Sequence, residues 1–164
     1  MIKQFIRAIA VIVCGFAVIP VYAVTNVTQS VNVTINLTSQ CKFSGGAPTV
    51  TLNYTSLQAT AATATTPFSV QCTNTLPYNL SIGTVTAGQN SPTVSATDST
   101  LNLAYSLAIQ SGGTTIAAAT GFTGNGSAQA YQILGTIAAN QAGTCSSGSS
   151  VCSHTSTQTL TISY

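Results

Sequence analysis

The stretch "SVNVTINLTSQC", residues 30–41, alternates apolar and polar side chains along most of its length. The apolar positions are Val31, Val33, Ile35 and Leu37. Successive side chains of a β-strand point to opposite faces, so the pattern predicts an extended strand with one apolar face. A lone strand cannot bury that face and needs a groove to fill. The groove belongs either to the strand's own domain or to another molecule.

The N-terminus has the layout of a secretory signal peptide. Lys3 and Arg7 precede an apolar run over residues 8–19, and small residues end at Ala23. The run is too short to span a bilayer, which takes about 20 residues. We therefore expect residues 1–23 to be removed and residues 24–164 to form one exported domain.

The mature chain carries almost no charge. Without the signal peptide, Lys42 and Asp98 are the remaining Lys, Arg, Asp or Glu residues. Nucleic-acid binding requires several cations against phosphates, so we exclude a nucleic-acid partner. A chain this poor in charge suits a protein that is packed into an assembly.

Four cysteines of the mature chain fit an oxidising compartment. They allow three disulfide pairings, and Cys145 and Cys152 flank the Ser- and Gly-rich loop "SSGSSV", which could close easily and leave Cys41 with Cys72. Zinc binding with His154 as a further ligand is the alternative, but no Cys-x-x-Cys spacing supports it.

The rest of the chain predicts short β-strands separated by turns. Strand-like segments occur at residues 49–57, 68–72, 78–83, 101–109, 130–137 and 157–164. Gly- and Ser-rich stretches such as "SGGAP" and "QSGGT" separate them, and no helical period is sustained. The fold class is therefore all-β, a single antiparallel β-sandwich.

A catalytic site is hard to build from these residues. The mature chain has one His, one Asp and no Glu or Arg. A Ser-His-Asp arrangement would need His154 and Asp98, which we expect in exposed loop or strand-end positions without a nucleophile elbow. We therefore predict no enzyme activity, no cofactor, no metal and no small-molecule substrate.

Several motifs in order make the chain similar to the spore coat protein U family, which includes pilins of archaic chaperone–usher (Csu-type) pili. The matching stretches are "VNVTINLTSQC", "FSVQCTNTLPYNLSIG", "ILGTIAANQ" and the final "TLTISY". By position, Cys41 and Cys72 correspond to the family's disulfide. The resemblance covers nearly all of the mature chain.

The resemblance implies an immunoglobulin-like sandwich that lacks its last strand and is completed by a donor strand from another subunit. A periplasmic chaperone and an outer-membrane usher would be its partners, together with identical or related pilins in a fimbria at the cell surface that serves adhesion and biofilm formation. The donor segment would span about residues 24–37, with Val27, Val31, Val33, Ile35 and Leu37 as its apolar side chains. The strand beside the open groove would present Leu160, Ile162 and Tyr164.

Two alternatives stay open. Residues 31–37 could be the first strand of their own sandwich, in which case the donor part lies earlier, around Val24, Val27 and Val31. The protein could also be a spore- or cell-coat protein, or a carbohydrate-binding surface module, that does not polymerise.

Overall fold

The computed structural model describes residues 24–84, 91–118, 120–146 and 149–164. The expected signal peptide, residues 1–23, lies outside these ranges. The chain divides into two units, Met1–Asn36 and Leu37–Tyr164, and all described strands belong to the second. Within the described ranges, no helix is long and apolar enough to cross a membrane.

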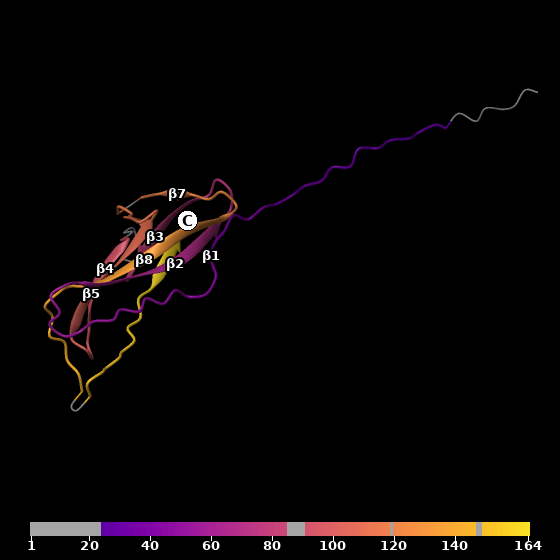
Figure 1. Ribbon diagram of the computed structural model, residues 1–164. Helices are drawn as coiled ribbons and strands as arrows, with labels where there is room; N and C mark the ends of the chain where they lie inside the picture. The colour runs from indigo at the N-terminus through magenta and orange to yellow at the C-terminus, as the bar shows by residue number, and fades with distance from the viewer. Residues whose placement is uncertain (1–23, 85–90, 119, 147–148) are drawn as a thin grey trace, which may run out of the picture. The chain divides into compact units, whose positions relative to one another are not determined.

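The larger of two antiparallel sheets has the strand order β1-β2-β8-β5-β4 (Figure 1). The short β6 pairs with β5. The strands of this sheet are β1 Cys41–Ser44, β2 Ala62–Cys72, β4 Thr93–Asp98, β5 Leu103–Ser111, β6 Thr114–Thr115 and β8 Ala128–Ile137. β8 lies at its centre and pairs with β2 on one side and β5 on the other.

The smaller sheet has the order β7-β3-β9 and is also antiparallel. Its strands are β3 Pro77–Ile82, β7 Phe122–Thr123 and β9 Leu160–Ser163. β3 is the middle strand, so β9 is paired on one edge among the described strands.

One hydrophobic core joins the two sheets. The larger sheet contributes alternate residues such as Val70, Ile109 and Ile133, and the smaller sheet contributes Tyr78 and Leu80. From Tyr131 to Ile137, every second residue of β8 is buried, as expected for a strand with one face on a core. The prediction of an all-β antiparallel sandwich is confirmed, and the core explains it, since the two apolar sheet faces cover one another.

An aromatic cluster fills one part of this core. The Phe68 and Tyr131 rings stack with centroids 5.6 Å apart, and Phe122 meets Tyr131 edge-on at 5.3 Å. The Tyr78 and Tyr131 hydroxyl oxygens lie 2.7 Å apart, so the two hydroxyl groups share a hydrogen bond inside the core. Burial raises the pKa of the Tyr131 phenol, so the pair stays neutral.

Two segments differ from the sequence-based expectation. Residues 49–57, predicted as a strand, form none, because no neighbouring strand pairs with them within the described part of the chain. The unpredicted β4 forms at Thr93–Asp98, where Val94 is the one large apolar residue among small ones, most of them polar. In both cases the availability of a neighbouring strand, and not the local pattern, decides the outcome.

Candidate assembly site

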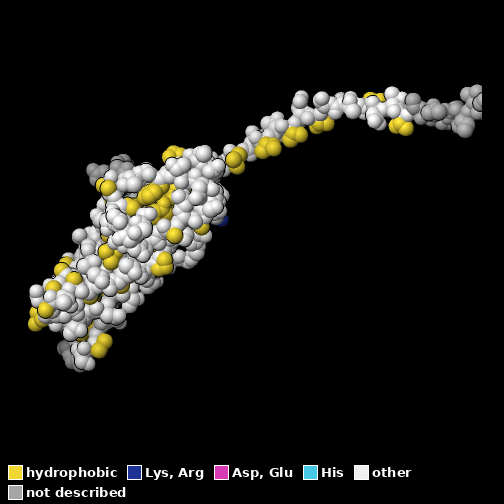
Figure 2. All heavy atoms as spheres, turned by 45° about the horizontal axis from the view of Figure 1, so that its top comes forward, with side chains coloured by type: hydrophobic (Ala, Val, Ile, Leu, Met, Phe, Trp, Pro, Cys, Tyr) yellow, Lys and Arg dark blue, Asp and Glu magenta, His cyan; other side chains and the backbone are white. Residues whose placement is uncertain are grey.

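The N-terminal segment, residues 24–40, is without helix or strand and exposes its apolar side chains. The exposed fractions are 93% for Val27, 82% for Val31, 76% for Val33, 84% for Ile35 and 80% for Leu37. Figure 2 shows hydrophobic side chains along one side of the extended segment. The first strand of the sandwich is β1, which starts at Cys41, and thus residues 31–37 do not form it.

The second surface of interest is the free edge of β9. Its ladder with β3 runs from Leu160 opposite Ile82 to Ser163 opposite Asn79. Leu160 and Ile162 are half-buried and pack against the core. Tyr164 lies one residue beyond β9, with 63% of its surface exposed. The other edge of β9 has no partner among the described strands, which leaves its backbone groups available for a further strand.

Residues 50–54 lie against the core as an extended segment without a ladder. Val50, Leu52 and Tyr54 are half-buried, and the residues between them are exposed. A Cβ atom at Gly135 of β8 would lie 2.7 Å from Val50 Cγ1 and 3.3 Å from Leu52 Cδ1. The segment therefore covers the inner face of the larger sheet. Among the described residues, no backbone hydrogen bond links residues 50–54 to another segment.

Gln141, from the "ILGTIAANQ" stretch, fastens the end of this segment. The Tyr54 hydroxyl donates to the Gln141 carbonyl at 3.1 Å and accepts from the Gln141 N–H at 2.7 Å. The Gln141 side-chain oxygen accepts from the Ala104 N–H at 2.7 Å, and its NH₂ group donates to the Ala104 carbonyl at 2.9 Å. The amide thus pairs with the start of β5 as a strand neighbour would, which gives this motif a structural role.

Two disulfides fix the chain, Cys41–Cys72 and Cys145–Cys152. Cys41 and Cys72 are also opposite each other in the β1–β2 ladder, so the bridge holds the short edge strand β1 on the sheet. Disulfide-bonded cysteines cannot serve as thiolate ligands, and all four cysteines of the zinc alternative are paired in this structure. Within the described ranges, no group of three or more His, Cys, Asp or Glu residues is placed to hold a metal ion.

The structure brings Asp98 and His154 together, which the sequence did not predict. His154 Nδ1 lies 2.7 Å from Asp98 Oδ2, while Asp98 Oδ1 accepts from the Thr100 N–H at 3.0 Å and the Leu101 N–H at 2.7 Å. Asp98 is the last residue of β4, one of the expected positions, but it is buried, with 7% of its surface exposed, so the expected exposure was wrong. The Leu101 backbone hydrogen bond, followed by the His154 side chain, lowers the pKa of the Asp98 carboxyl. All these contacts fasten chain segments to one another, and no serine hydroxyl is bonded to the imidazole among the described residues.

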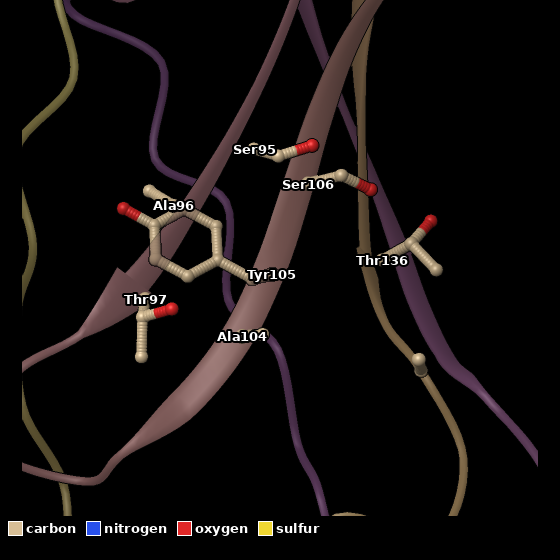
Figure 3. A pocket seen from close by; sticks show the side chains of 8 residues that line it. Ser95, Ala96, Thr97, Ala104, Tyr105, Ser106 and Thr136 are labelled. Carbon is tan, nitrogen blue, oxygen red and sulfur yellow. The ribbon is translucent and has the colours of Figure 1, made fainter.

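A shallow hollow of about 350 Å³ lies on the larger sheet, across β4, β5 and β8 (Figure 3). Ser95, Ser106 and Thr136 are opposite one another on these neighbouring strands. The hollow is lined by Ser95, Ala96, Thr97, Ala104, Tyr105, Ser106, Thr136 and Ala138. None of these side chains is a carboxylate, imidazole, thiol or amine.

The described strands form an all-β sandwich, one edge of β9 is unpaired among them, and the N-terminal segment exposes its apolar side chains. Residues 27–150 match the Spore Coat Protein U domain, which is a structural, pilin-type domain and not an enzyme family. The chain belongs to this family, whose members are exported surface or coat proteins. No curated protein and no solved structure matches the chain.

Proposed function

We propose that this protein is a structural pilin subunit of an archaic chaperone–usher pilus that polymerises by donor-strand exchange. The observation that carries the proposal is the row of exposed aliphatic side chains at alternate positions from Val31 to Leu37. The family match begins at residue 27, so this segment is part of the family domain although it forms no strand in its own sandwich. In this proposal the segment binds to another subunit.

The free edge of β9 is the acceptor in this proposal. An incoming strand would hydrogen-bond to the β9 backbone, and its alternate side chains would cover the half-buried Leu160 and Ile162. Burying one Val, Leu or Ile side chain contributes about 1.5–3 kcal/mol. The donor segment has five such side chains, those of Val27, Val31, Val33, Ile35 and Leu37. Together they contribute on the order of 10 kcal/mol, as much as the whole stability of an ordinary domain. We propose residues 50–54 as the other border of the groove.

The proposed partners follow from this mechanism. A periplasmic chaperone would cover the open edge before assembly, and an outer-membrane usher would pass the subunit to the growing fimbria. The fibre would extend from the cell surface and serve adhesion and biofilm formation.

Three proteins test the proposal: the mature chain, a chain without residues 24–37, and the mature chain with a copy of residues 24–37 fused after Tyr164 by a flexible linker. We expect the fusion to be a monomer with a melting temperature at least about 15 °C above that of the truncated chain, because its groove is filled in cis. A fusion whose copied segment carries Val31→Asp and Val33→Asp is the matched control and should lose this gain. Native mass spectrometry and thermal melting provide the measurements.

One result would contradict donor-strand polymerisation. If the mature chain is a stable monomer without a chaperone and melts at the same temperature as the fusion, its groove is not open. The protein would then be a coat protein or a carbohydrate-binding surface module that does not polymerise.

A further inference from the structure

Among the described strands, none pairs with the segment that leads into β9. Residues 153–159 form no strand, and the backbone hydrogen bond that reaches them runs from the Gly83 N–H to the Thr159 carbonyl at 2.8 Å. Side chains provide further contacts to this segment within the described part of the chain.

Alternate residues of the segment provide those side-chain contacts. His154 meets Asp98 at 2.7 Å, and the Ser156 hydroxyl lies 2.8 Å from the Tyr105 hydroxyl. The Gln158 side-chain N–H donates to the same Tyr105 oxygen at 2.9 Å. Contacts at every second residue are the signature of an extended strand with one face on the sheet.

The same parity continues into β9. Leu160 and Ile162 follow His154, Ser156 and Gln158 at every second position and pack on the core. Residues 154–162 therefore present one continuous face to the sandwich, polar in its first part and apolar in its second. Asp98 and Tyr105, at the end of β4 and the beginning of β5, anchor the polar part.

We infer that Asp98 and Tyr105 are positioning residues that extend the acceptor edge of β9 back to His154, so that a second copy's residues 27–37 meet an edge running from His154 to Ile162. The inference rests on the proposed donor-strand function and concerns the length and placement of its acceptor. We name the contacts of Asp98 and Tyr105 with His154, Ser156 and Gln158 the polar latch.

Lengths favour this occupant. Residues 27–37 span about 36 Å when extended at about 3.3 Å per residue. β9 has 4 residues and spans about 13 Å, whereas residues 154–162 span about 30 Å. The extended edge matches most of the donor segment, and β9 alone matches about a third of it.

Capture of a labelled peptide with the sequence of residues 24–37 tests the inference. The full chain is kept dilute, so that the peptide far outnumbers the chain's own segment. We expect His154→Ala and Tyr105→Phe each to slow peptide capture about tenfold or more. His154→Asn should restore much of the rate, because its side-chain N–H can still donate to Asp98. Thr155→Ala, an exposed neighbour of opposite parity, should leave capture unchanged.

The rescue by asparagine separates positioning from a general loss of stability. Capture by His154→Ala and Tyr105→Phe at the rate of the unmodified chain would overturn the inference while leaving the donor-strand proposal intact. Equal slowing by Thr155→Ala would also overturn it, since the effect would not depend on the polar latch. If the unmodified chain captures no peptide, the donor-strand proposal fails and the inference falls with it.

Discussion

Residues 31–37 place large apolar side chains at every second position, and residues 131–137 of β8 are buried at every second position. In β8, Tyr131, Ile133 and Ile137 are 3–6% exposed, and β2 and β5 pair with the two edges. In the N-terminal segment, Val33 is 76% exposed and Val27 is 93% exposed, and no strand forms. Two stretches with the same period thus have opposite surroundings. An alternating pattern predicts that one face of a segment is buried, but it does not tell which molecule buries that face.

The largest expected effect comes from placing the same charge in both regions. Ile133→Asp should prevent folding, because an unpaired carboxylate in the core costs several kcal/mol out of a total stability of about 5–15 kcal/mol. Val31→Asp should leave the melting temperature of the unassembled chain within about 2 °C of the original and abolish assembly. Circular dichroism of the exported protein and electron microscopy of fibres measure the two outcomes.

Asn32→Asp is the control for the N-terminal substitution, since its side chain has the opposite parity and would face solvent in a donor strand. Fibres of normal length from Val31→Asp would contradict the assignment of residues 31–37 to an intersubunit groove.

The two disulfides should differ in their contributions to stability. The separations are 31 residues for Cys41–Cys72 and 7 residues for Cys145–Cys152. Restriction of the unfolded chain then contributes about 4 and about 2 kcal/mol, respectively. Replacing Cys41 and Cys72 by Ser should lower the melting temperature by about 12 °C, and replacing the other pair should lower it by about 7 °C. A larger loss from the Cys145 and Cys152 pair would show that the second loop matters more for the sandwich than this structure implies.

A substitution at Gly135 of β8 tests whether residues 50–54 lie on the inner face of the larger sheet, because these residues approach β8 at that position. Gly135→Val should lower the free energy of unfolding by about 1–3 kcal/mol through its clash with Val50 and Leu52. Gly46→Ala, with no atom within 4 Å of the added Cβ, is the control and should change it by less than about 0.5 kcal/mol. Denaturant unfolding of both variants provides the measurement. No difference between them would place residues 50–54 away from β8.

The smallest effect concerns acid. The folded state lowers the pKa of Asp98, so it favours the ionised carboxylate over the protonated one. The resulting stability is present above about pH 4, the ordinary range of an aspartate, and is lost as the pH falls through the lowered pKa. The melting-temperature difference between the native chain and Asp98→Asn should therefore shrink between pH 5 and the most acidic conditions. A constant difference over this range would argue against the role of the charge.

Local patterns in the sequence were sufficient to predict the β-sandwich, but they did not predict which segments pair at the edges of its sheets. The alternating segments at residues 68–72, 78–83, 101–109 and 130–137 lie in strands because each finds a neighbour. Residues 49–57 carry the same kind of pattern but lack a neighbouring strand among the described residues. The pattern alone therefore predicted a strand that does not form. β4 was missed because small residues such as Ser95 and Ala96 give little hydrophobic signal, although they pair well with β5.

The candidate assembly site was predictable only in part. Both apolar rows, residues 31–37 and Leu160 with Ile162, are visible as alternation. The polar latch is not visible in the sequence, because Asp98 and His154 are 56 residues apart and only folding brings β4 beside the segment before β9. No local motif encodes that contact.

The pairing of Asp98 with His154 also affects how two subunits would meet. Asp98 is the one Asp or Glu residue of the whole chain. It is buried beside the His154 imidazole and therefore does not act as a surface charge. With no acidic surface to attract a basic partner, diffusional encounter gains nothing from electrostatic steering. The association rate between copies should therefore stay in the unsteered range of about 10⁵–10⁶ M⁻¹s⁻¹ and hardly change with ionic strength. Fibres built from such subunits would grow at similar rates in fresh and in salt water.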